Sequence, residues 1–67
     1  MPPKIRELKS RLMAAGFMMR SGKGSHTVWT HAKSPRVVSL SGQDGDDAKP
    51  YQEKQVAQAI NQIEDPP

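Results

Sequence analysis

The chain has 67 residues, a net charge of +3 and no cysteine, which excludes two independent cores, disulfides and thiolate zinc sites. We therefore expect one domain over residues 1–67, with its core at about residues 4–63. The longest near-apolar run, Leu12 to Met19, is far shorter than the roughly 20 residues that span a bilayer, and we expect a cytoplasmic protein without a signal peptide.

The first predicted element is an amphipathic helix. Ile5, Leu8, Leu12 and Ala15 recur at intervals of three and four residues, which places them in one apolar stripe. Gly16 suits the end of this helix because glycine adopts a left-handed conformation at little cost.

Three short strands are predicted next. Residues 17–21 and 25–30 are rich in β-branched, aromatic or alternating residues, and Gly22 to Gly24 between them predict a hairpin loop. A turn at residues 31–35 contains a proline, and a third strand is expected at residues 36–40.

A loop and a second helix complete the predicted fold. Residues 41–49 are glycine-rich and acidic without hydrophobic periodicity, so we expect an exposed loop. A second apolar stripe then consists of Val56, Ala59, Ile60 and Ile63. The sequence predicts an α+β fold of order α-β-β-β-α: a three-stranded antiparallel sheet with both helices packed on one face and the other face open.

Charge is divided unevenly along the chain. Up to Arg36, eight basic residues against one acid give +7, whereas from Val37 onward two basic residues against six acids give −4. A field of one sign over half of so small a body attracts polyanions such as nucleic acid, although ordinary solubilising charge is an equal alternative.

His26 is the candidate catalytic residue. It ends the segment Lys23-Gly24-Ser25-His26 at the mouth of the predicted hairpin, where glycine permits close backbone approach and Lys23 can meet a phosphate. An imidazole near neutral pH can deprotonate a ribose 2′-hydroxyl, a reaction that needs no metal or cofactor. Lys23 and Arg20 are candidates to stabilise the phosphorane, and Arg20, Lys23, Gly24 and Ser25 are candidates to bind RNA.

Strand alternation leaves an alternative for His26, because it shares the side of Val28 and Thr30, which could face the core. If Val28 is buried, Trp29 lies on the open face, where its indole could stack on an RNA base; the alternative is a Trp at the core edge or at a protein interface. His31 lies in a turn, and we expect it to be exposed or hydrogen-bonded to backbone rather than catalytic.

Two further features receive structural interpretations. The segment Asp44 to Asp47 lacks the acidic ligand of a calcium loop, since Gln55 stands at the twelfth position, so a solvated loop or a protein contact is expected. Met13 and Met19 are expected in the core, with an adaptable interaction surface as the alternative.

The order of these segments resembles the HicA toxin family. The resemblance rests on Lys-Ile-Arg-Glu-Leu at 4–8, Ala-Gly-Phe at 15–17 and Lys-Gly-Ser-His-Thr-Val-Trp-Thr-His at 23–31, and it covers about residues 4–63. It implies a fold like that of double-stranded-RNA-binding domains and an mRNA-cleaving endoribonuclease (mRNA interferase) that a HicB antitoxin inhibits. It also implies that His26 is catalytic, with Gly24 and Ser25 at their family positions.

The sequence departs from the family after the third strand. Many members have Pro-x-His and a basic run there, whereas residues 41–51 of this chain are mostly acidic and polar, so no RNA contact is carried over to that region. The alternatives to a nuclease are a non-enzymatic RNA-binding domain of the same fold and a small domain that binds only protein.

Overall fold

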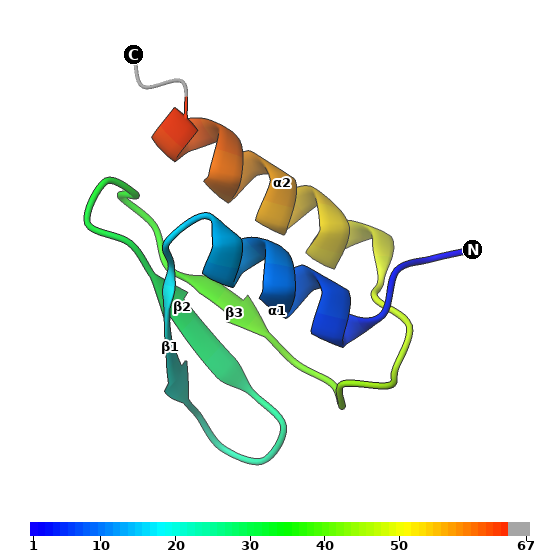
Figure 1. The fold of residues 1–67 in the computed structure, drawn as a ribbon. Coiled ribbons are helices and arrows are strands. Elements are labelled where there is room, and N and C mark those ends of the chain that lie inside the picture. The colour runs from blue at the N-terminus through cyan, green and yellow to red at the C-terminus, as the bar shows by residue number, and fades with distance from the viewer. Residues whose placement is uncertain (65–67) are drawn as a thin grey trace.

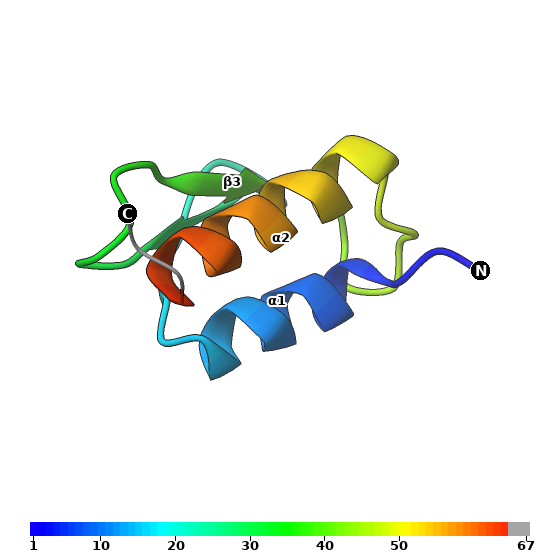
Figure 2. The same cartoon turned by 90° about the horizontal axis from the view of Figure 1, so that it is seen from above.

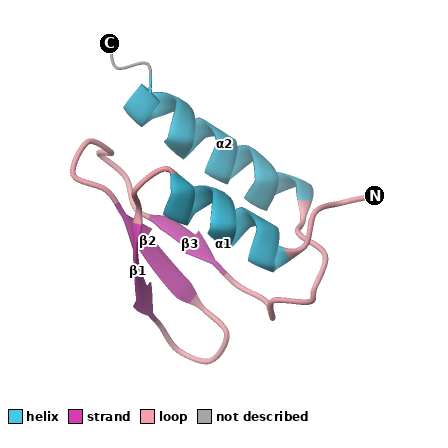
Figure 3. Ribbon diagram, viewed as in Figure 1, coloured by secondary structure: helices cyan, strands magenta, loops and turns pink. Residues whose placement is uncertain are grey.

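The computed structural model describes residues 1–64 and shows the predicted order of elements. Helix α1 and the sheet are followed by a long loop and helix α2 (Figures 1 and 3). The elements are α1 (Ile5–Ala14), β1 (Met18–Ser21), β2 (Thr27–Thr30), β3 (Val38–Leu40) and α2 (Pro50–Glu64). The predicted α+β fold is confirmed, and each strand is shorter than the sequence indicated by one or two residues.

Helix α1 buries the predicted apolar stripe and ends as the sequence indicates. Ile5, Leu8 and Leu12 are buried, and Gly16 has a φ of 94°. The amide of Phe17 donates to the carbonyl of Leu12 at 3.0 Å, so the chain folds back onto the last turn of the helix. This turn sends the chain directly into β1.

The sheet is an antiparallel meander of order β1-β2-β3, with Met19 opposite Trp29 and Trp29 opposite Val38. Both helices cover one side of this sheet (Figure 2). Because successive side chains in a strand point to opposite faces, Trp29, Val38 and Leu40 enter the core on the helix side. Arg20, which lies opposite Val28, belongs to the other face.

The prediction that Met13 and Met19 lie in the core is wrong. Their exposures are 60% and 51%, because Met13 lies outside the stripe of α1 and Met19 lies on β1, which is an edge of the sheet. All four residues of β1 are exposed, Met18 to 74%. The core consists instead of Ile5, Leu8, Leu12, Phe17, Trp29, Val38, Leu40, Ala48, Val56 and Ala59, with Ala15, Ile60 and Ile63 partly buried against it.

The acidic loop between β3 and α2 is folded against the start of α1. Asp47 pairs with Lys4 and Asp44 with Lys9, each at 2.6 Å. The carbonyl of Asp46 accepts a hydrogen bond from the amide of Ile5 at 2.9 Å. The predicted exposed loop is confirmed, since residues 43–47 are exposed. In addition, its carbonyl groups accept hydrogen bonds from amides at the start of α1 that have no partner within the helix.

Gln52 is a buried polar residue that the hydrophobic pattern did not indicate. It is 2% exposed, and its Oε1 accepts from the amide of Lys49 at 2.9 Å while its Nε2 donates to the carbonyl of Ser41 at 3.0 Å. Both ends of the amide are therefore satisfied, which removes the cost of burying it. Gln52 ties the first turn of α2 to the residue that follows β3.

Candidate functional site

The segment that contains His26 is a tight loop between β1 and β2. The amide of Gly22 donates to the carbonyl of His26 at 2.8 Å, and the amide of His26 donates to the carbonyl of Lys23 at 3.0 Å. Gly24 has a φ of 60°, a conformation that residues with a Cβ rarely adopt. These bonds hold the backbone of His26 at the start of β2, with Lys23 in the same turn.

His26 is exposed, and the alternative in which its ring is buried in the core is wrong. The core-facing residues of β2 are Thr27 and Trp29, so strand alternation directs His26 to the opposite face together with Val28 and Thr30. The loop that contains it extends away from both helices (Figure 1). The ring is thus accessible to a large substrate.

Gly22 and Ser25 define the shape of this loop. A Cβ at Gly22 would lie 3.2 Å from the carbonyl oxygen and 3.3 Å from the Cβ of His26, which is tighter than most such contacts in proteins. Ser25 is half-buried, and its Oγ accepts a hydrogen bond from the amide of Gly42 at 3.1 Å. The Ser25 oxygen is therefore engaged within the protein.

The positive side chains near the loop form no ion pair with any of residues 1–64. In the described part of the chain, residues 1–64, the ion pairs are those of Lys4 and Lys9 with the acidic loop. Arg20 and Lys23 are exposed and take part in neither pair. Lys33 and Arg36 are also exposed, but they lie in the connection between β2 and β3, at the other end of β2 from His26. The hairpin side of the sheet therefore keeps its positive charge, whereas two lysines of the first helix region are neutralised.

The expectation that Trp29 lies on the open face is wrong. Its side chain is 1% exposed and packs in the core, because the helix-facing residues of β2 are the odd-numbered ones. Val28, whose burial was the condition for an exposed indole, lies on the other face and is half-exposed. Trp29 therefore cannot stack on an RNA base in this fold, and it lies within the core rather than at the core edge that the alternative proposed.

His31 makes the local hydrogen bond that its turn position suggested. Its Nδ1 accepts from the amide of Lys33 at 2.9 Å, and its ring packs on Phe17 with centroids 5.1 Å apart. His26 precedes β2 and His31 follows it, so five residues of extended chain separate their backbones by roughly 16 Å. The two imidazoles cannot act together on one phosphate.

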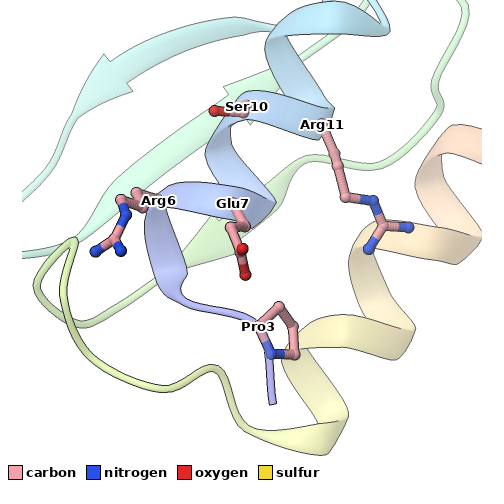
Figure 4. Close-up of a pocket in the computed structure, with 5 residues that line it drawn as sticks. All are labelled: Pro3, Arg6, Glu7, Ser10 and Arg11. Carbon is pink, nitrogen blue, oxygen red and sulfur yellow. The ribbon is translucent and has the colours of Figure 1, made fainter. Parts of the chain in front are cut away.

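A shallow depression lies elsewhere, on the exposed side of α1. Its walls are Pro3, Arg6, Glu7, Ser10 and Arg11, and Figure 4 shows the two arginine side chains pointing in different directions, with Glu7 between them. None of the site residues predicted from the sequence lines it. In residues 1–64 no group of three or more His, Cys, Asp or Glu side chains is placed to hold a metal ion. No helix in that range is long and apolar enough to cross a membrane.

Comparisons with known proteins give one match. Residues 5–63 match the model of a family described as the HicA toxin of bacterial toxin-antitoxin. No curated protein and no solved structure matches the chain. The family match spans nearly the whole chain and includes the hairpin with His26, both helices and the three strands. The chain therefore belongs to the HicA toxin family, the toxin half of a bacterial toxin–antitoxin pair.

Proposed function

We propose that the protein is an endoribonuclease that cleaves mRNA, with His26 as the group that accepts and donates protons. The observation that carries this proposal is the placement of His26: it is exposed at the start of β2, in one tight turn with Lys23. Arg20 lies in the adjacent strand, two residues from the start of the loop. An accessible imidazole among cations matches the needs of phosphodiester cleavage in RNA.

The proposed reaction uses the RNA's own 2′-hydroxyl. His26 takes the proton from this hydroxyl, the 2′-oxygen attacks the adjacent phosphorus, and the bond from phosphorus to the 5′-oxygen breaks. The products are a 2′,3′-cyclic phosphate and a 5′-hydroxyl, whose proton comes from protonated His26 or from water. Lys23 and Arg20 stabilise the negative charge that builds up on the phosphorane.

The antitoxin implied by the family is proposed to be HicB-like and to cover His26 with the neighbouring cations. A core this small seldom supplies more than about 3 to 5 kcal/mol of stability. A partner that binds the folded toxin raises this figure through mass action. Inhibition and stabilisation would then follow from the same contact.

The test compares the purified protein with a His26→Gln variant on single-stranded RNA and on DNA of the same sequence, both in the presence of a chelator. We expect the wild-type protein to cut RNA and leave DNA intact, because DNA lacks the attacking hydroxyl. The variant should cut at least about a hundredfold more slowly, the lower range for general acid–base catalysis. Matching circular dichroism spectra are required, so that unfolding does not imitate the loss of a catalytic group.

Two results would reject parts of the proposal. Cleavage that survives in His26→Gln would reject this residue as the base. Tight binding of RNA without cleavage by the wild-type protein would reject the nuclease and support a non-enzymatic RNA-binding domain of the same fold.

A further inference from the structure

The loop that contains His26 is fastened to the rest of the protein by the hydroxyl of Ser25. The amide of Gly42 donates to Ser25 Oγ at 3.1 Å, and the two residues are 17 positions apart. Within residues 1–64, this is the one side-chain hydrogen bond between loop residues 22–26 and another part of the chain. The orientation of the loop therefore depends on where Gly42 is held.

Gly42 has a backbone conformation that favours glycine, and it lies against Ile5 and Asp46. Its φ is 115°, and a Cβ there would lie 3.4 Å from Cγ1 of Ile5 and 3.5 Å from Oδ2 of Asp46. The next residue, Gln43, donates its amide to the same Asp46 oxygen at 2.9 Å. A side chain at position 42 would thus be strained in conformation, although it would meet Ile5 of α1 only at ordinary van der Waals distance.

Both helices anchor the segment around Gly42. The amide of Ile5 in α1 donates to the carbonyl of Asp46 at 2.9 Å, and Lys9 pairs with Asp44 at 2.6 Å. From α2, the buried Gln52 donates to the carbonyl of Ser41 at 3.0 Å. The Gly42 amide is therefore a fixed donor, to which the hairpin loop is tied through Ser25.

Ser25 and His26 are consecutive residues, but their side chains differ in burial. Ser25 is half-buried against the loop after β3, whereas His26 is exposed. Fixing Ser25 on one side therefore fixes the direction in which the next side chain leaves the backbone. Small displacements of a catalytic group slow the reaction, because a misplacement of about 1 Å can lower the rate about a hundredfold.

We propose that Ser25 is a positioning residue, which aims His26 at the substrate by holding the hairpin to the Gly42 amide, and is not a ligand of RNA. This role rests on the proposed nuclease function. It replaces the expectation that Ser25 contacts RNA. It also gives the acidic loop a role in the site, because that loop supplies the amide to which Ser25 is bonded.

The test uses Ser25→Ala, which removes the acceptor, Ser25→Thr, which keeps a hydroxyl, and Ser10→Ala as a matched control for the same change on the exposed side of α1. On single-stranded RNA we expect Ser25→Ala to lower kcat about ten- to a hundredfold while KM changes less than about twofold. Ser25→Thr should recover most of kcat, and Ser10→Ala should match the wild-type protein.

NMR supplies a readout that does not need activity. In Ser25→Ala the Gly42 amide should exchange with solvent about fivefold faster, since a typical hydrogen bond contributes about 1 kcal/mol. Backbone order parameters of residues 23–26 should fall, while those of β2 stay constant. Ser25→Thr should restore both values.

Several results would overturn the proposal. A raised KM with unchanged kcat in Ser25→Ala would make Ser25 an RNA ligand, and an unchanged kcat with a faster Gly42 exchange would make the bond merely structural. If the wild-type protein cuts no RNA, the nuclease function fails by itself, and unchanged order parameters in Ser25→Ala would then separately reject the hold on the hairpin.

Discussion

The indole Nε1 of Trp29 donates a hydrogen bond to Oγ1 of Thr27 at 2.9 Å, and both residues lie on the helix-facing side of β2. The pair lets a large aromatic side chain enter the core without leaving its polar N–H unsatisfied. Thr27 is 8% exposed, so water does not readily replace its hydroxyl. The bond also explains how Trp29 can be a core residue in a sheet with one open face.

Replacing Thr27 by Val should destabilise the protein although the side chain keeps its shape. The buried indole N–H of Trp29 would lose its acceptor, at a cost of about 1 to 3 kcal/mol. Thr27→Ser keeps the acceptor and loses one methyl group, worth about 0.8 kcal/mol. Urea unfolding of the three proteins measures both effects, and a Val variant as stable as the wild type would contradict the role of the bond.

Truncating two adjacent residues of α1 should lower the free energy of unfolding by very different amounts. Leu12 is fully buried, so Leu12→Ala should cost about 2 to 5 kcal/mol, enough to unfold a domain of this size. Met13 is 60% exposed, and Met13→Ala should change stability by no more than about 0.5 kcal/mol. Thermal melts followed by circular dichroism distinguish them, and a comparable loss in both variants would refute the burial assigned to Met13.

The ion pair of Lys9 with Asp44 should contribute little to stability. The Asp44 side chain is 65% exposed, and pairs of this kind are worth about 0.2 to 1 kcal/mol. A double-mutant cycle with Lys9→Ala and Asp44→Ala in low and high salt measures the coupling. We expect the coupling to shrink as salt is added, and a coupling independent of salt would indicate a contact other than the ion pair.

The salt dependence of RNA binding should report which cations meet phosphate. In an inactive His26→Gln background, Arg20→Ala and Lys23→Ala should each reduce the slope of log K against log salt by about 0.7 for single-stranded RNA. Lys4→Ala removes the same charge, but Lys4 is paired with Asp47 at 2.6 Å, so its slope should not change. Filter binding at several salt concentrations gives the slopes, and equal effects at all three positions would mean a non-specific charge effect.

Most of the fold could be predicted from periodicity and turn residues. The sequence predicted the apolar stripes of both helices, the hairpin at Gly22 to Gly24 and the glycine that ends α1. Each of these features is a local property of a few neighbouring residues. The exposure of His26 followed once the face of β2 was known, yet the sequence left that face undecided. The alternation of side chains along β2 defines two faces, but it does not say which face is buried until the helices pack against one of them.

The errors have a common origin in contacts between distant segments. Trp29 and Val28 are both suited to a core, and the choice between them is made by the helices, which cover one face of the sheet. Met19 faces the helix side but is on an edge strand, where coverage ends. The exposed acidic loop was predicted without its contacts, because Lys4 and Lys9, its ion-pair partners, are 43 and 35 positions away in the sequence.

The meander order of the sheet has a consequence for how the chain folds. Each strand pairs with its immediate neighbour in sequence, so the sheet assembles through short loop closures, and proteins rich in local contacts fold quickly. The contact between Lys4 and Asp47 spans 43 positions and so closes a much longer loop than either strand pairing does. We therefore expect the hairpin to form early in the folding reaction, and the junction of the acidic loop with α1 to form among the last steps.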